Sequence, residues 1–457
     1  FYSAVLNGLT QDGNRLAGVR HKVFGEEIGI GFNALNPGIA VGVLHARPDL
    51  SRMEEFDPGG IYLLPETVSD LPPIAGILTA GEGNPLSHVQ LLARNLGIPN
   101  VTVDEGLISR LEAHDGEQVV MAVSPAGLVE LAPFDAHWEK ILGEEGMASD
   151  VVIRPDLAKL DLSAREFISL DDLRASDSGR TVGPKAAKLG ELRRAFPESV
   201  APGVAIPFGI FKAEVLDRPY RDSDQSIYDW MVAQYRALAA LPAGSPERAA
   251  RTEAFRAELY DLIIATRHSA RFREQLRSAM VGTFGNADTG VFVRSDTNVE
   301  DLPGFTGAGL NLTLPNVIGF DKLLPAINEV WASPFTARAF AWRQSHMESP
   351  EHVYTSILLL GAVASDKSGV LVTQDLDTGD RQVISVAVNE GVGGAVDGQA
   401  AESLRVDTRN GNVRVMATAT APWRRRPAAS GGIEKLPASG SETVLAPAEI
   451  RRLISFA

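Results

Sequence analysis

The sequence predicts a multidomain protein of mixed α/β and α+β class, and three observations support this prediction. The chain has 457 residues, of which 44% are hydrophobic, so it is long enough to bury more than one core and suggests roughly two to four domains. Residues 34–133 alternate short apolar runs with a helical pattern, which is typical of a small α/β domain. Residues 167–457 hold further strand-like runs around a helical stretch, which indicates a second, larger domain with a helical insertion.

The remaining segments precede or connect these two domains. Residues 1–33 are polar and interrupted by glycines, and we expect them to be the tail of an upstream domain. Residues 134–166 mix charged residues, helix formers and a few apolar residues, which predicts a linker. This composition suits a hinge and a passive connector equally well. The chain opens with Phe-Tyr-Ser and no signal segment follows, so we expect a fragment of a longer protein.

Composition excludes several classes of function. The formal net charge of -15 argues against a general binder of nucleic acid or anionic membranes. The absence of cysteine excludes disulfides and thiolate metal sites, and it fits a cytoplasmic protein. No apolar run approaches the length of a membrane span; the longest candidate is residues 357–364. We therefore expect no nucleic acid and no membrane among the partners.

In the smaller domain, turn signals separate the expected strands. An Asn-Pro-Gly turn at Asn36 precedes an alternating apolar strand, and a chain of short runs follows. These further runs lie at residues 61–64, 77–79, 101–103, 118–123 and 128–131.

One helix of this domain carries a histidine in its first turn. The predicted helix begins near residue 86 and is stopped by Gly97 and Pro99. Ser87 with Gln90 forms a predicted capping box, and Asn84 with Pro85 is an alternative, earlier cap. His88 then lies where free backbone amides and the positive end of the helix dipole suit an anion. A phosphoryl group on the imidazole would be held there, with the ring as nucleophile. For an isolated histidine, a solvated helix-cap residue is the simpler interpretation.

The larger domain contains two blocks with cations suited to phosphate. In residues 182–211 a Gly-Pro turn presents Lys185 at a helix start. In residues 290–317 a strand at 291–293 delivers Arg294 into a loop, where Glu300 and Asp301 follow. A guanidinium can fork two phosphate oxygens, and Glu300 could hold that arginine or a nucleotide. The alternatives are a solvated lysine and an Arg-Glu salt bridge that only staples a loop.

A third block begins at residue 330 with a helix that bears Arg338 and Arg343. Two strand-like segments around an Asp-Thr-Gly turn follow within residues 368–380. The Arg-Arg-Arg run at residues 424–426, with Pro, Ala, Ser and Gly after it, predicts a flexible solvated loop. Residues 447–456 predict a helix close to the end of the chain.

Several motifs resemble one superfamily. The pattern TxxxxxxLSHVxxxARNxGIPN of residues 79–100 resembles the phosphohistidine signature of the phosphoenolpyruvate synthase, pyruvate phosphate dikinase and glucan water dikinase superfamily. The second block resembles its VRSSxxxEDxxxxxFAG pattern, and the third resembles its RAxxYR pattern. The resemblance implies a small swivelling phosphohistidine β/α domain at residues 34–133. It also implies an ATP-grasp nucleotide-binding domain at residues 167–457, with its C-terminal strands missing.

The resemblance also implies roles for individual residues. His88 would be the catalytic phosphate carrier, oriented by Thr79 and Ser87. The residues implied to bind ATP are Lys185, Arg294, Glu300, Asp301 and Arg338. Mg2+ is implied as well, but the sequence shows no ligand set for it.

The implied activity is that of an ATP-dependent dikinase, a phosphotransferase with paired acceptors. Phosphate would pass from ATP through phospho-His88 to a small-molecule or glucan acceptor, with release of AMP. A third domain outside this sequence would bind the acceptor. The sequence identifies neither that acceptor nor the oligomeric state.

Two departures from the family pattern motivate an alternative. Leu360 replaces a glutamine near the end of a strand, and Gly394 replaces the glutamate of a GLGE motif. A catalytically degenerate, nucleotide-binding regulatory module would tolerate both changes. An enzyme that loads its histidine from phosphoenolpyruvate would share only the histidine domain, and it would leave the Lys185 and Arg294 blocks unexplained.

Overall fold

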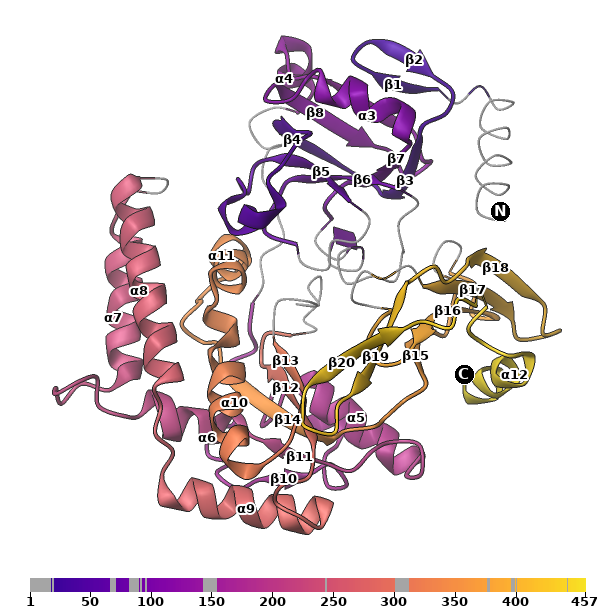
Figure 1. The fold of residues 1–457 in the computed structure, drawn as a ribbon. Coiled ribbons are helices and arrows are strands. Elements are labelled where there is room, and N and C mark those ends of the chain that lie inside the picture. The colour runs from indigo at the N-terminus through magenta and orange to yellow at the C-terminus, as the bar shows by residue number, and fades with distance from the viewer. Residues whose placement is uncertain are drawn as a thin grey trace. The chain divides into compact units, whose positions relative to one another are not determined.

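The fold is given by a computed structural model (Figure 1). The described residues are 18, 20–65, 71–81, 90, 93–94, 97–142, 154–242, 245–300, 312–375, 379–395, 399, 401–441 and 443–457. The chain divides into two compact units: unit 1 holds Phe1–Asp150, Ala364–Arg426 and Glu434–Ala457, and unit 2 holds Val151–Val363 and Pro427–Ile433. Both contain sheets and helices, which confirms the predicted mixed α/β class. The domain limits given above stay predictions.

Unit 1 contains a nine-stranded sheet with the order β2-β1-β9-β8-β4-β5-β6-β7-β3. Its strands are β1 (His21–Val23), β2 (Glu26–Ile28), β3 (Phe32–Asn36), β4 (Gly38–His45), β5 (Ile61–Pro65), β6 (Gly76–Ala80), β7 (Asn100–Val103), β8 (Gln118–Val123) and β9 (Val129–Pro133). A 3-10 helix (Leu50–Glu55) and the helices α3 (Glu105–Glu112) and α4 (Ala136–Leu142) accompany them.

Strands β4, β5, β6 and β7 are parallel neighbours in this sheet. The residues of β7 are buried throughout, as expected for a strand covered on both faces. Helix α3 buries Leu107 and Leu111 in the same core. Each strand expected from the apolar runs at residues 61–64, 77–79, 101–103, 118–123 and 128–131 is present within about two residues at its ends.

Unit 1 also holds a four-stranded antiparallel sheet. Its strands, in order, are β15 (Lys367–Val372), β16 (Val383–Glu390), β17 (Glu402–Asp407) and β18 (Val413–Ala417). Ile384, Val386 and Leu404 alternate onto one face, where α12 (Pro447–Phe456) packs through Leu453. The helix predicted for residues 447–456 is confirmed.

The arginine run at residues 424–426 does not form the flexible loop that its composition predicts. It lies in β19 (Trp423–Pro427), which pairs with β20 (Ile433–Pro437). Arg426 donates to Glu434 across the hairpin at 2.7 Å. The side-chain amide of Asn316 donates to the carbonyls of Ala428 at 2.8 Å and Gly432 at 3.0 Å, and so anchors the turn between the two strands. A contact so distant in sequence leaves no signal in local composition.

Unit 2 is built on a five-stranded antiparallel sheet. Its strands, in order, are β10 (Ile168–Ser169), β11 (Gly203–Ile206), β14 (Thr355–Gly361), β12 (Val291–Thr297) and β13 (Thr313–Val317). The helices are α5 (Pro184–Ala195), α6 (Phe208–Phe211), α7 (Ile227–Ala239), α8 (Pro246–Ile264), α9 (Ala270–Phe284), α10 (Phe320–Ala332) and α11 (Ala337–His346). Short helical turns lie at Ala175–Asp177, Lys212–Leu216 and Ser333–Phe335.

Both faces of this sheet are covered. Ile357 and Leu359 of β14 point into a large core with helices α7 to α10. Leu358, between them, points into a smaller core with Ala186 and Ala187 of α5. Successive residues of β14 therefore point to opposite faces of the sheet, as expected for a strand. Helix α5 covers the face opposite the large helical core.

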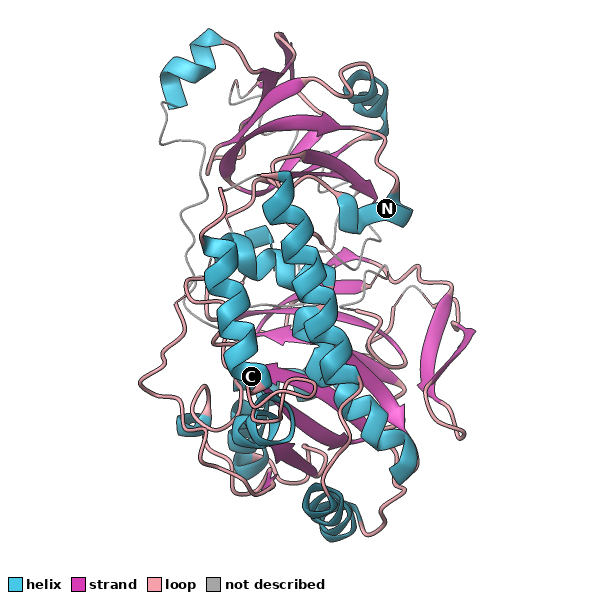
Figure 2. Ribbon diagram, turned by 90° about the vertical axis from the view of Figure 1, so that its left-hand side faces the viewer, coloured by secondary structure: helices cyan, strands magenta, loops and turns pink. Residues whose placement is uncertain are grey.

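The predicted helical insertion is confirmed. Helix α8 begins at Pro246, and the Ser245 side chain accepts from the amide of Arg248 at 3.2 Å. Helix α9 begins after Ser269, which accepts from the amide of Phe272 at 3.1 Å. Helices α7 and α8 run side by side (Figures 1 and 2). None of the helices in the described part of the chain is both long and apolar enough to cross a membrane.

Candidate functional site

Lys185 lies at the start of α5, where the Gly-Pro turn predicts it. Gly183 is the N-cap residue and Pro184 the first residue of the helix. The fixed φ of proline suits this position, and its missing N–H costs no helical hydrogen bond. The backbone amides of Lys185 and Ala186 are then left to find acceptors outside the helix.

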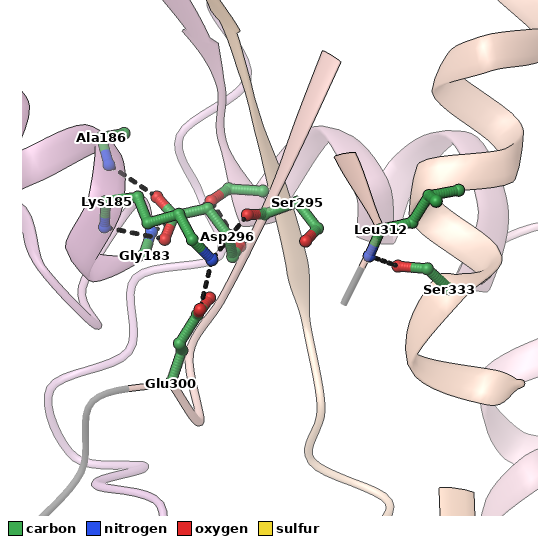
Figure 3. Close-up of polar contacts among 9 residues, drawn as sticks. Gly183, Lys185, Ala186, Ser295, Asp296, Glu300, Leu312 and Ser333 are labelled. Carbon is green, nitrogen blue, oxygen red and sulfur yellow. Dashed lines mark hydrogen bonds and ion pairs between the residues drawn. The ribbon is translucent and has the colours of Figure 1, made fainter. Parts of the chain in front are cut away.

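A buried carboxylate from β12 accepts from both of these amides (Figure 3). Oδ1 of Asp296 accepts from the amide of Lys185 at 2.9 Å, and Oδ2 accepts from that of Ala186 at 2.8 Å. Gly183 permits this approach, because a Cβ there would lie 2.2 Å from Oδ1. The Ser356 hydroxyl accepts from the Gly183 amide at 3.0 Å and donates to the Asp296 carbonyl at 2.7 Å. These contacts fix the start of α5 against β12 and β14.

The Lys185 ammonium group lies between two acceptors. It donates to the carbonyl of Ser295 at 3.1 Å and forms an ion pair with Oε1 of Glu300. The Glu300 side chain is only 5% exposed, whereas that of Lys185 is 30% exposed. Oε2 of Glu300 is buried and has no hydrogen-bond partner among the described residues. One ammonium group therefore balances two carboxylates, those of Glu300 and Asp296.

This charge imbalance affects the titration of Asp296. Burial raises the pKa of Asp296 and the Glu300 carboxylate adds to this rise, while Lys185 and the two amide donors oppose it, so that the pKa lies at about 7. Asp296 is fully buried, so its negative charge depends on Lys185 and the helix start for stabilisation.

Arg294 differs from its predicted surroundings. It lies within β12, opposite Leu358 of β14, and not in a loop as the apolar run at residues 291–293 predicts. Polar residues extend this strand because Asp296 and Ser356 are buried between it and α5. Strand alternation places Arg294 on the same face as Asp296. Glu300 pairs with Lys185, so the Arg294–Glu300 salt bridge considered above is not formed.

The other residues predicted to bind nucleotide are only partly placed. Arg338 lies on α11, whose Phe340 belongs to the large core. Asp301 lies outside the described residues, and so do Ser87 and His88. The roles of these residues stay predictions.

In unit 1, Thr79 belongs to a buried polar chain. Its hydroxyl donates to Oδ1 of Asn100 at 3.2 Å, and Nδ2 of Asn100 donates to Oε1 of Gln90 at 2.6 Å. Thr79 lies near the end of β6 and Asn100 begins β7, while Gln90 is a helical residue of the segment between these strands. The chain of hydrogen bonds therefore ties that helix to the sheet.

The end of the same helix is capped as predicted. Gly97 has a φ of +66°, and the amide of Ile98 donates to the Ala93 carbonyl at 2.9 Å, which is the Schellman arrangement. The buried amide of Asn36 donates to the carbonyls of Ala93 at 3.2 Å and Ile98 at 2.7 Å. The side chain of Asn36 thus caps this helix end, and the residue also lies at the turn before β4.

Sequence reasoning missed two residues of these networks. Asn100 is the last letter of the pattern that begins with Thr79, so a signal for it was present. Asp296 stands where the VRSSxxxED pattern has its second serine, and this departure was the available signal. The groups to which Asn100 and Asp296 are hydrogen-bonded do not follow from the local sequence.

The two departures Leu360 and Gly394 lie in different units. Leu360 packs against the small core beside α5. A Cβ at Gly394 would lie 2.5 Å from Oε1 of Gln399, so a larger side chain there requires Gln399 to move. In the described part of the chain no three His, Cys, Asp or Glu side chains come together as a metal site.

Comparison with known proteins assigns the chain to a family. The chain is 29% identical over 283 residues to a rifampicin phosphotransferase of Streptomyces sp, a match that covers 59% of this chain and 29% of that protein. It is 31% identical over 233 residues to a phosphoenolpyruvate synthase of Pseudomonas aeruginosa, which covers 50% of this chain and 28% of that protein. The chain thus spans less than a third of the length of these relatives. A family model described as "Pyruvate phosphate dikinase, AMP/ATP-binding domain" matches residues 179–454, which include Lys185, Asp296 and Glu300. The chain belongs to the pyruvate phosphate dikinase AMP/ATP-binding domain family.

Proposed function

We propose that the protein is an ATP-dependent dikinase that moves phosphate from ATP through His88 to an acceptor and releases AMP. The observation that carries this proposal is the cluster of Lys185, Asp296 and Glu300 at the start of α5, within the residues that match the family. The named relatives, a rifampicin phosphotransferase and a phosphoenolpyruvate synthase, support a phosphotransferase.

In this proposal Lys185 and Arg294 supply positive charge to the nucleotide phosphates. Lys185 exchanges its contact with Glu300 for a phosphate oxygen, while Arg294 offers two parallel N–H groups from the same face of the sheet. Fixed cations stabilise the charge that develops on a transferring phosphoryl group without reorganisation. Glu300, Asp301 and Arg338 are the further nucleotide contacts of this proposal.

His88 is the proposed nucleophile. Its imidazole nitrogen attacks the β-phosphorus of ATP. The bond from that phosphorus to the oxygen it shares with the α-phosphorus breaks, and AMP leaves with this oxygen. The histidine then carries a pyrophosphoryl group. Its terminal phosphoryl group passes to the oxygen of a second acceptor, water or inorganic phosphate, the bond to the oxygen that bridges the two phosphorus atoms breaks, and phosphohistidine remains. Thr79 and Ser87 orient the ring, and the hydrogen bonds from Thr79 through Asn100 to Gln90 support the helix that follows.

The domain assignment follows the same proposal. Residues 34–133 would be the swivelling phosphohistidine domain, residues 134–166 its linker, and residues 167–457 the ATP-grasp domain. Mg2+ would accompany ATP and neutralise phosphate charge, as in other phosphoryl transfers. We assign it no protein ligands, because no suitable group of side chains exists among the described residues.

A nucleotide-binding regulatory module is the second candidate. Leu360, which stands in place of a glutamine, packs against the small core. Gly394 stands in place of the glutamate of the family motif, and the side chain of Gln399 lies beside it. A chain that keeps the Lys185 cluster and lacks these polar groups would bind nucleotide without turnover.

Labelling of the protein separates the candidates. The full-length protein and its His88→Ala variant are incubated with ATP labelled at the β position, and acid-labile label on protein is measured together with AMP. A dikinase gives label on the parent only. Binding of ATP without AMP release favours the regulatory module, and equal label on both proteins excludes His88 as the carrier. Labelling from phosphoenolpyruvate alone favours an enzyme that uses that donor.

A further inference from the structure

The start of α5 is already occupied by an anion from the protein itself. Both free amides of its first turn, those of Lys185 and Ala186, donate to the Asp296 carboxylate. A helix start of this kind is where phosphate groups commonly bind. In this chain, however, the carboxylate is completely buried, so a nucleotide phosphate has no access to the two amides.

Other contacts show that the surroundings of Asp296 are shaped for a carboxylate. Gly183 leaves room that a Cβ would fill, since that atom would lie 2.2 Å from Oδ1 of Asp296. Ser356 joins the Gly183 amide to the Asp296 carbonyl and so fixes strand and helix start together. The two adjacent amides each donate to a different oxygen of one side chain, which a carboxylate can provide and a single hydroxyl cannot.

The consequence for Lys185 is a fixed backbone with a movable side chain. Its amide is held by Asp296, while its ammonium group, 30% exposed, is held by Glu300 and the carbonyl of Ser295. Nucleotide can therefore engage Lys185 through the ammonium group only, and it must compete with Glu300 for that contact.

We propose that Asp296 is a positioning residue of the nucleotide site, which fills the anion position at the start of α5 and so fixes the backbone from which Lys185 reaches phosphate. This inference rests on the proposed function for the identity of the ligand. It assigns to Asp296 a role that the motif resemblance does not imply.

Small-anion rescue tests the proposal. Asp296→Ala removes the carboxylate and leaves a space that formate can enter and phosphate cannot. We expect the variant to bind Mg2+-ATP about tenfold more weakly than the parent in calorimetric titration, because Lys185 loses its position. Formate should restore most of the affinity and should protect the amides of Lys185 and Ala186 from hydrogen exchange. Phosphate should do neither.

Ser245→Ala is the matched control. It removes the cap of α8 in the same unit, so it lowers stability by a similar mechanism away from Lys185. Its ATP affinity should equal that of the parent, and formate should not change its melting temperature. If the alanine variant does not fold, Asp296→Asn is titrated with Mg2+-ATP without formate. It keeps the volume but loses one of the two acceptor oxygens, so the inference requires weaker ATP binding and faster exchange of the Lys185 and Ala186 amides, and parent-like values would overturn it.

The results separate the inference from the proposed function. If Asp296→Ala binds ATP as the parent does, or if formate changes neither affinity nor amide exchange, the positioning role is wrong. If the parent itself binds no ATP, the proposed function fails. Formate-dependent recovery of amide protection and melting temperature then still decides whether Asp296 holds the start of α5.

Discussion

Lys185 shows how a single residue links fold and chemistry. Its ion pair with Glu300 joins two residues that are far apart in sequence and meet only because α5 packs on β12. Its position at a helix start follows from the local Gly-Pro signal. The identity of its partner does not, because pairing depends on tertiary packing. The sequence therefore predicts Lys185 and Glu300 as site residues, whereas their pairing and the contacts of Asp296 come from the structure.

Breaking this ion pair from the lysine side should destabilise the protein. Lys185→Met leaves Glu300 buried without its counter-charge, so we expect the free energy of unfolding to fall by about 1–3 kcal/mol. The double variant with Glu300→Gln should recover part of this loss, because it removes the uncompensated charge. Urea unfolding measures both. A double variant as unstable as Lys185→Met would show that the charge pairing contributes nothing.

Asp296 should make stability depend on pH. Its pKa is raised from 3.8 in the unfolded chain to about 7 in the fold, so the folded state binds the extra proton between these values. The contribution of this group is therefore fully present below pH 4 and is lost as pH rises through 7. We expect the stability of the parent relative to Asp296→Asn to fall between about pH 4 and pH 7 in urea unfolding. A constant difference would contradict the raised pKa.

At the scale of elements, features that depend on local signals were predictable from the sequence, whereas features that depend on tertiary contacts were not. The serine caps of α8 and α9 and the helix end at Gly97 were predictable, because they depend on neighbouring backbone groups. Strand β12 extends to Thr297, beyond its apolar residues, since its polar end is buried against α5. The β19–β20 hairpin was missed because Asn316 anchors it from another part of the chain.

Asn316 offers a test of that hairpin. Its φ is 49°, which asparagine and glycine tolerate better than alanine, and its amide holds the carbonyls of Ala428 and Gly432. Asn316→Gly should lower stability by about 1–2 kcal/mol through lost hydrogen bonds, and Asn316→Ala should lower it further through backbone strain. Hydrogen exchange of the hairpin amides should rise in both variants. Unchanged exchange would mean that Asn316 does not anchor the turn.

At the scale of the whole molecule, the proposed function requires His88, in the chain segment of unit 1, to receive phosphate from a proposed nucleotide site in unit 2. The mixed α/β class and the family were predictable from the sequence, because several motifs recur in order along it. The internal arrangement of the site was only partly predictable. Asp296 and the pairing of Glu300 with Lys185 arise where β12, β14 and α5 meet.

The most direct test of the central claim is the amount of AMP formed in a single turnover. The full-length protein, His88→Ala and Lys185→Met are each mixed with Mg2+-ATP without an acceptor, and AMP is measured against time. If His88 is the phosphate carrier and Lys185 binds the nucleotide, the parent gives a burst of about one AMP per chain and neither variant gives one. A burst of equal size from the His88→Ala protein would show that His88 does not carry the phosphate.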